Sequence, residues 1–220
     1  ERPVVLTAAM RPATAMSSDG ALNLFQAVRV ASTPEIGRLG TVVLMNERIH
    51  AMRDVTKGQT YGVDAFRSRT HGPLGEISAD GRITLYRTPV RLPSTAPRFK
   101  VGGAVVLPRV DIILSYYGAD GALIDAAVAA GARGLVSSGF GPGRAGPGLV
   151  EAFDRAVATG CVVVQSARGG EGRVVPSSLL AAKGWLAADD LTPWKARLLL
   201  MLALTTTRDF REIQEIFLRY

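Results

Sequence analysis

A lysine in an arginine-rich chain is the first candidate for chemistry. The chain has 22 arginines and four lysines, and Lys57 ends a polar stretch that begins at Arg53. The stretch follows the apolar run 41–45, which is short, continuous and β-branched at its start, as in a buried parallel strand. Open α/β sheets bind ligands beyond the carboxyl ends of their strands, so Lys57 is predicted to lie near such a site. The alternative is an ordinary solvated lysine.

The glycine-rich segment 141–146 fits the G-x-G-x-x-G pattern between a predicted strand and a predicted helix. The next strand ends at Gln165 without a carboxylate to bind a ribose, and Pro142 removes one amide from a phosphate cradle. A tight strand-to-helix turn is therefore the preferred interpretation. A nucleotide-binding domain is the alternative.

The other reactive side chains show no local motif. His50 and His71 are the only histidines, and their spacing suits no metal site, so both are predicted to be structural or at the surface. Cys161 lies in an apolar run and is predicted to be a buried, inert thiol. No nucleophile elbow or phosphate-binding loop is present.

Composition favours a folded domain. The 220 residues are 47% hydrophobic and 20% charged, and no apolar run reaches the length of a membrane span. The net charge of +7 raises the possibility of nucleic-acid binding. However, the arginines are scattered and no aromatic residues interleave with them, so neither a nucleic-acid nor a membrane partner is expected.

Alternating hydrophobic patterns predict an α/β fold with parallel strands. In the first half they predict strands at 3–9 and 41–46, a helix at 21–31, a short helical turn at 63–68, and a hairpin at 77–87. In the second half they predict strands at 110–115, 134–138 and 161–165, and helices at 121–130, 147–159, 193–206 and 208–220. The first helix is expected to be capped by Ser18 or Asp19 and to carry an apolar face of Leu22, Leu24, Phe25 and Val28.

A proline- and glycine-rich stretch at 88–108 is typical of a linker. It predicts two domains, at 1–87 and 109–220.

Several segments together resemble the bacterial type II L-asparaginases and glutaminase-asparaginases. They run in order along nearly the whole chain: 8–12, 16–20, 23–24, 45–46, 53–57, 72–75, 87–89 and 195–220. The resemblance implies the remainder of a parallel-sheet N-terminal domain, followed by a smaller flavodoxin-like parallel α/β domain. It also implies a homotetramer, with each site between two subunits, and no cofactor.

The implied reaction is hydrolysis of the side-chain amide of L-asparagine, and in some members L-glutamine, through an acyl-enzyme on threonine. Lys57 matches the lysine of the family's Thr-Lys-Asp triad, which helps to deprotonate the weakly nucleophilic threonine. Ala9 matches the alanine whose backbone contacts the reacting amide. Asp19 is interpreted as a helix cap and not as a catalyst.

Three departures from the family pattern bear on activity. The nucleophilic threonine and its partners would lie upstream of Ala9, in a segment absent from this chain, so the chain alone is expected to be inactive. Arg144 stands where the family offers Asn or Ser to the substrate. The segment 175–180 lacks the glutamate expected before Gly184. Arg144 would repel a substrate ammonium group, and the missing carboxylate would weaken its binding.

The alternative function is a non-catalytic amino-acid-binding or assembly domain with the same fold. The sequence leaves both the bacterial periplasm and the cytoplasm open as compartments.

Overall fold

The computed structural model describes residues 3–91, 98–99, 101–102 and 105–220. The chain forms two compact units, the N-terminal unit at 1–97 and the C-terminal unit at 98–220, and each is treated by itself. Residues 92–97, 100 and 103–104 of the predicted linker lie outside the described residues. The domain limits at 87 and 109 stay a prediction.

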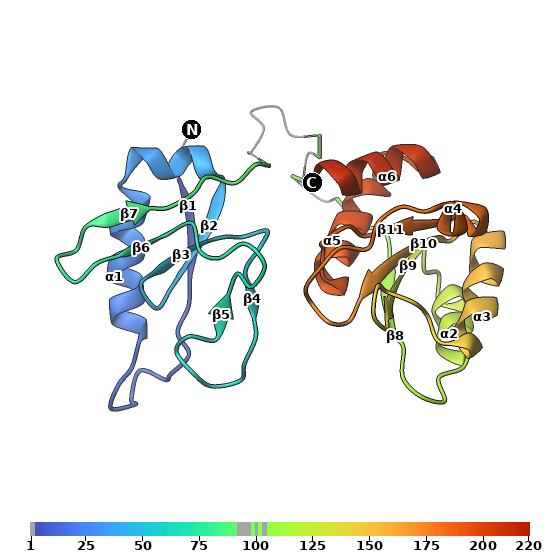
Figure 1. Ribbon diagram of the computed structural model, residues 1–220, viewed down its shortest axis with the longest axis horizontal. Coiled ribbons are helices and arrows are strands. Elements are labelled where there is room, and N and C mark those ends of the chain that lie inside the picture. The colour runs from blue at the N-terminus through green and yellow to red at the C-terminus, as the bar shows by residue number, and fades with distance from the viewer. Residues whose placement is uncertain (1–2, 92–97, 100, 103–104) are drawn as a thin grey trace. The chain divides into compact units, whose positions relative to one another are not determined.

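The N-terminal unit is built on a five-stranded sheet in the order β1-β2-β3-β6-β7 (Figure 1). The strands are β1 (Val4–Thr7), β2 (Thr41–Met45), β3 (Arg48–Ala51), β6 (Gly75–Ile77) and β7 (Ile83–Leu85). Helix α1 (Gly20–Ala31) and the 3-10 helix η1 (Pro34–Leu39) connect β1 to β2, and these two strands are parallel, as predicted. All other neighbours in this sheet are antiparallel.

Strand β3 is one element that the hydrophobic pattern did not reveal. It returns antiparallel to β2 through Asn46 and Glu47, whose φ angles are 48° and 63°. Two successive positive φ values are typical of the tight turns that match the twist of a hairpin. Neither residue is glycine, so the usual sequence signal for this turn is missing.

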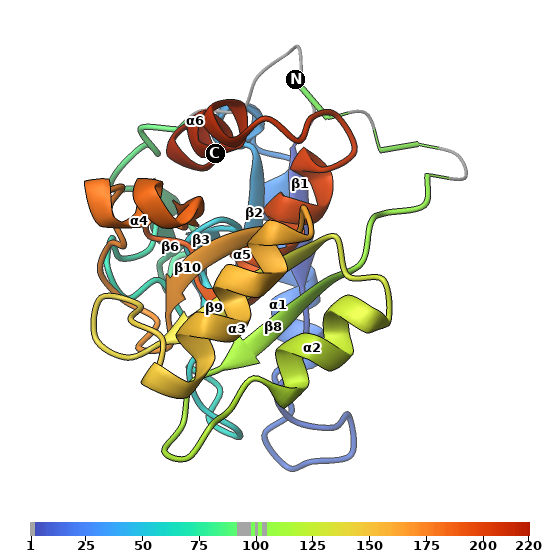
Figure 2. The same ribbon diagram turned by 90° about the vertical axis from the view of Figure 1, so that its right-hand side faces the viewer.

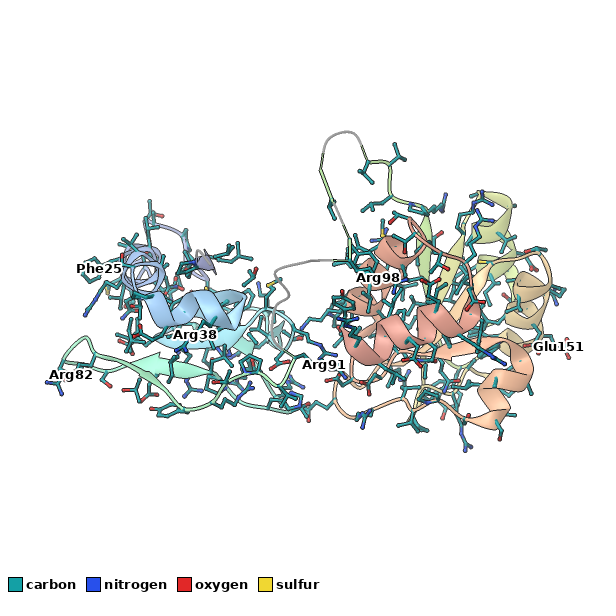
Figure 3. The ribbon with its side chains drawn as sticks, turned by 90° about the horizontal axis from the view of Figure 1, so that it is seen from above. Phe25, Arg38, Arg82, Arg91, Arg98 and Glu151 are labelled. Atoms are coloured by element: carbon teal, nitrogen blue, oxygen red, sulfur yellow. The ribbon has the colours of Figure 1, made fainter. Side chains whose placement is uncertain are left out.

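Helix α1 packs on the sheet through a different face from the predicted one. Ala27 and Val30 join the core with β2 and η1, and Asn23 and Gln26 are buried beside them. The predicted apolar face is 50–60% exposed at Leu22, Leu24, Phe25 and Val28. Figure 3 shows Phe25 pointing away from the sheet. The predicted apolar face is therefore present on α1 but is not the face that packs against the sheet.

The C-terminal unit is a parallel sheet between two helical layers (Figures 1 and 2). Its order is β11-β10-β9-β8, from β8 (Val110–Leu114), β9 (Gly134–Gly139), β10 (Val162–Ala167) and β11 (Trp185–Ala187). One face packs against α2 (Ala122–Ala129), α3 (Pro147–Ala158) and α4 (Ser178–Lys183). The other packs against α5 (Pro193–Ala203) and α6 (Phe210–Arg219). Strands β9, β10 and β11 are thus covered on both faces, which explains their continuous apolar runs, while Ile112 and Leu114 of the edge strand β8 are exposed.

The α/β class and the parallel sheet of the C-terminal unit are confirmed, whereas the N-terminal sheet, expected to be parallel, is parallel only between β1 and β2. One local prediction fails. The segment 63–68 is not a helical turn, because Phe66–Arg67 forms strand β5, which pairs with β4 (Thr56–Lys57). No helix in the part of the chain that the structure describes has the length and apolar character needed to span a membrane.

Candidate active site

Lys57 lies on a short hairpin above the sheet of the N-terminal unit. Strands β4 and β5 pair through Thr56 with Arg67 and Lys57 with Phe66, and the amide of Gly58 donates to the carbonyl of Ala65 at 2.7 Å. The side chain of Lys57 is exposed, and its ammonium group has no hydrogen bond or ion pair to any described residue. It is thus available to a group from outside this part of the chain.

A small apolar cluster brings the Lys57 hairpin and the Ala9 segment together. Val43 and Met45, on one face of β2, pack with Val55, and the partly buried Met10 and Phe66 pack against the same cluster. Met10 follows Ala9, and Phe66 is the strand partner of Lys57. Both segments therefore lie over one face of β2 near its carboxyl end, which is where the sequence placed the candidate chemistry.

The Ala9 segment is held by Asp19. Its carboxylate accepts hydrogen bonds from the amides of Met10 (3.0 Å) and Arg11 (2.9 Å) and from the side-chain amide of Asn23 (3.1 Å). Desolvation by burial would raise the pKa of Asp19, but these hydrogen bonds outweigh it and lower the pKa. Asp19 stands at the N-cap position of α1 without capping it through its side chain. The predicted cap position is therefore confirmed, but the carboxylate braces the loop after β1 and makes no capping hydrogen bond.

Asn23 completes this brace from the buried side of α1. Its side-chain amide donates to the carbonyl of Ala8 at 3.0 Å, and its side-chain carbonyl accepts from the amide of Asn46 at 3.2 Å. One buried side chain thus ties the end of β1 to the end of β2. The pair Asn23 and Asp19 fixes the backbone around Ala9, whose own side chain is exposed. Sequence reasoning named neither role.

Asp54 lies three residues before Lys57, and basic side chains surround its carboxylate. Its Oδ2 is 3.0 Å from Nη2 of Arg87, and its Oδ1 is 3.8 Å from Nδ1 of His71 and 3.9 Å from Nη1 of Arg53. The side chain of Asp54 is only 12% exposed, so its negative charge lies at the edge of the core and is balanced by the neighbouring arginines. His71 is half exposed, as predicted.

His50 is buried in the same unit, on β3, and is structural. Its Nδ1 lies 3.0 Å from the hydroxyl of Ser68, and Nε2 has no partner among the described residues. Burial, reinforced by the charges of Arg48 and Arg87, lowers the pKa of His50 to about 4. The imidazole is therefore neutral at neutral pH.

Arg144 belongs to the C-terminal unit and is presented by a tight turn after β9. The amide of Phe140 donates to the carbonyl of Arg144, and the amide of Arg144 donates back to Phe140, both at 2.8 Å. Gly141 and Gly143 have positive φ angles of 47° and 88°. Arg144 is an exposed residue. The glycine pattern thus makes the strand-to-helix turn that the sequence favoured.

The segment that lacks the expected glutamate is an ordered loop and helix start. Ser177 caps α4 by accepting a hydrogen bond from the amide of Leu180 at 3.3 Å, and Gly184 ends the helix with φ 67°.

Cys161, which directly precedes β10, is buried as predicted, and burial raises the pKa of its thiol to about 11. No three acidic, histidine or cysteine side chains of the described residues cluster as metal ligands would.

Comparison with known proteins decides the family. The family model described as "Asparaginase, N-terminal" matches residues 1–91, and "Glutaminase/Asparaginase C-terminal domain" matches residues 109–217. The chain belongs to the asparaginase family. The resemblance in the sequence and the two-part α/β architecture are both confirmed.

Asparaginase relatives match the chain from end to end. L-asparaginase 2 of Bacillus subtilis is 43% identical over 220 residues, covering 100% of this chain and 58% of the relative. L-asparaginase 2 of Escherichia coli is 40% identical over 222 residues, covering 100% and 64%. Glutaminase-asparaginase of Acinetobacter glutaminasificans is 40% identical over 229 residues, covering 100% and 67%. The chain thus spans about three-fifths of the length of the first two asparaginases.

Proposed function

We propose that this chain is part of an amidohydrolase that converts L-asparagine to aspartate and ammonia. The observation that carries the proposal is similarity along all 220 residues to proteins named L-asparaginase, at up to 43% identity. The ordered hairpin that presents Lys57 beside the Ala9 segment supports it.

The proposed reaction runs through an ester on a threonine that an upstream segment supplies. The threonine oxygen attacks the side-chain carbonyl carbon, the C–N bond breaks, and ammonia leaves with the proton that the hydroxyl gave up. Water then attacks the ester, releasing the carboxylate and restoring the hydroxyl. Lys57 is proposed to assist removal of the hydroxyl proton, because an alcohol is a weak nucleophile without a neighbouring base.

Ala9 is proposed to face the reacting amide through its backbone. The support is the bracing of the adjacent amides of Met10 and Arg11 by Asp19, which leaves the peptide at Ala9 with a fixed orientation. A preorganised backbone group orients the substrate without losing conformational freedom during the reaction.

Arg144 and the segment 175–180 are proposed to weaken the binding of free asparagine. An exposed guanidinium next to the substrate ammonium group would repel it, and no carboxylate in 175–180 offsets the charge. The family resemblance further implies a homotetramer in which Arg144 would reach the site of a neighbouring subunit. Both points belong to this proposal.

The test is ammonia release from L-asparagine and L-glutamine by the protein at its natural full length. We expect Lys57→Ala to lower kcat by about three orders of magnitude or more, as for catalytic groups that act as a unit. Lys183→Ala is the matched control, because Lys183 pairs with Asp154 at 2.6 Å in the C-terminal unit. Near wild-type turnover in Lys57→Ala would remove the lysine from the mechanism.

A second function is a non-catalytic amino-acid-binding or assembly domain. Arg144 and the missing carboxylate at 175–180 favour its assembly form, since both disfavour a free amino-acid ligand. The second function predicts that the full-length protein releases no ammonia from asparagine, and calorimetry with asparagine and aspartate separates the binding form from the assembly form.

A further inference from the structure

Arg87 is fixed at the end of the N-terminal sheet by its own backbone. The amides of Tyr86 and Arg87 both donate to the carbonyl of Leu74, at 2.8 and 3.3 Å, and Leu74 is fully buried. The amide of Leu74 in turn donates to Ile49 of β3 at 2.6 Å. The backbone of Arg87 is therefore held in place by hydrogen bonds, and its side chain is only 27% exposed.

The guanidinium bonds to both ends of the hairpin that carries Lys57. Its Nη2 donates to Oδ2 of Asp54 at 3.0 Å, just before β4 begins. Nη2 also donates to the carbonyl of Gly72 at 2.6 Å, and Nε donates to the carbonyl of Pro73 at 3.2 Å, after β5 has ended. One planar side chain thus ties the entry of the hairpin to its exit.

The hairpin needs such an anchor because its own pairing is short. It has two residue pairs, Thr56 with Arg67 and Lys57 with Phe66, and two-stranded hairpins are marginal in water even when they are longer. Val55 and Phe66 pack the inner side of the hairpin against Val43 and Met45 of β2. Apolar contacts are not directional, however, and do not fix where Lys57 points.

We infer that Arg87, acting through Asp54 and the carbonyls of Gly72 and Pro73, is the positioning residue for Lys57. This inference rests on the proposed function, in which Lys57 assists a nucleophile from another segment. A displacement of about 1 Å in a reacting group can cost about 100-fold in rate. Arg87 touches no reacting atom, so its contribution is the geometry of the lysine.

The experiment compares Arg87→Met, Arg87→Lys and Lys57→Ala in the full-length protein. For Arg87→Met we expect kcat to fall about 100-fold with KM changed less than about threefold, because the lysine is misplaced and the rest of the site is kept. Arg87→Lys is expected to recover only part of kcat. Its ammonium group reaches Asp54 as a point charge but lacks the planar fork that also bonds two carbonyls. Asp54→Asn takes the place of Arg87→Met if the latter does not fold.

Arg82→Met is the matched control. Arg82 pairs with Asp80 at 3.3 Å in the turn between β6 and β7, is 86% exposed, and lies at the outer tip of that hairpin in Figure 3. Its loss removes an arginine–aspartate pair of the same chemistry without touching the Lys57 hairpin, so kcat and KM are expected to stay unchanged.

Hydrogen exchange gives a readout that does not depend on turnover. In Arg87→Met the amide of Gly58, bonded to Ala65, is expected to exchange at least about tenfold faster, while amides between β2 and β3 keep their rates. Unchanged kcat in Arg87→Met beside an inactive Lys57→Ala overturns this inference and leaves the proposed function standing. Unchanged exchange at Gly58 overturns it as well. An active Lys57→Ala removes the lysine from the mechanism and overturns this inference with it. The proposed function itself is overturned only if the wild-type full-length protein releases no ammonia.

Discussion

Asp19 and Asp54 lie on polar segments, and neither of their roles is visible in the local sequence. Asp19 stands one residue before a helix, where a cap is the usual interpretation, yet its carboxylate binds the amides of Met10 and Arg11. Asp54 meets Arg87 across 33 positions of sequence. Lys57 was found because lysine is rare here and its segment resembles a family motif. Its supporting residues depend on tertiary contacts that no spacing encodes.

His50 gives a pH dependence of stability. Its pKa is about 4 in the folded protein, below the 6.5 of an exposed histidine, because of burial first and then the charges of Arg48 and Arg87. As the pH falls below about 6.5, His50 becomes protonated in the unfolded chain but stays neutral in the folded chain. The free energy of unfolding therefore falls until about pH 4, by at most about 3 kcal/mol.

Melting temperatures at about pH 7 and about pH 4.5 measure this effect. His50→Asn keeps a polar atom near the position of Nδ1 and is expected to reduce the loss of stability on acidification. Ser68→Ala is the control, since it removes the 3.0 Å partner but leaves the imidazole to titrate. An identical acid shift in His50→Asn and the wild type would assign the pH dependence to other groups.

At the scale of elements, long periodic segments were predictable and short ones were not. The helices at 147–158 and 210–219 and the strands β8, β9 and β10 lie within a few residues of their predicted positions, whereas the three-residue strand β11 was not predicted. Strands β4 and β5 have two residues each, too few to show a period, so 63–68 was mistaken for a helical turn. The apolar residues of α1 were predicted to share one face, but their spacing does not tell which surface packs against that face.

The turn that presents Arg144 depends on the absence of a side chain at Gly139. A Cβ there would lie 2.1 Å from the carbonyl oxygen of Gly143 and 2.5 Å from that of Arg144. Gly139→Ala is therefore expected to open the turn and to cost at least about 2 kcal/mol, because backbone and not a flexible side chain must move. Urea unfolding of the C-terminal unit measures the loss.

Gly146→Ala is the comparison for this variant. It lies at the other end of the same loop with φ −62°, and its nearest new contact would be a ring atom of Phe140 at 4.0 Å. No steric loss is expected, and the total loss should stay at about 1 kcal/mol or less, because Gly146 is the N-cap of α3, where alanine is less favourable than glycine. Equal losses for the two alanine variants would contradict the steric argument.

At the scale of the whole molecule, the two units differ in how completely they cover their apolar surface. In the C-terminal unit helices pack on both faces of the sheet, and the exposed large apolar strand residues, Ile112 and Leu114, are confined to the edge strand β8. In the N-terminal unit β1 is the edge strand of the sheet as described, with Val4 and Leu6 about half exposed, and Phe25 of α1 is 60% exposed. Exposed strand edges and apolar patches of this kind favour association with other segments or chains.

The 220-residue chain is therefore expected to melt in two steps. The N-terminal unit should unfold at the lower temperature and aggregate, and the C-terminal unit should follow in a cooperative transition. Calorimetry with hydrogen exchange assigns each step to a unit. The full-length protein, which we propose to cover β1 and α1, is the control and should melt at a higher temperature. A single cooperative transition of the 220-residue chain would contradict this prediction.

The strand order β8, β9, β10, β11 in the C-terminal sheet has a consequence for protein synthesis. Each strand joins the edge formed by the one made just before it, so a chain leaving the ribosome never has to insert a strand between two others. Helices α5 and α6, however, are made after all four strands, and they pack on one face of the sheet. During translation the apolar residues of that face stay exposed until the final helices emerge, and a chaperone would protect the nascent chain in this interval.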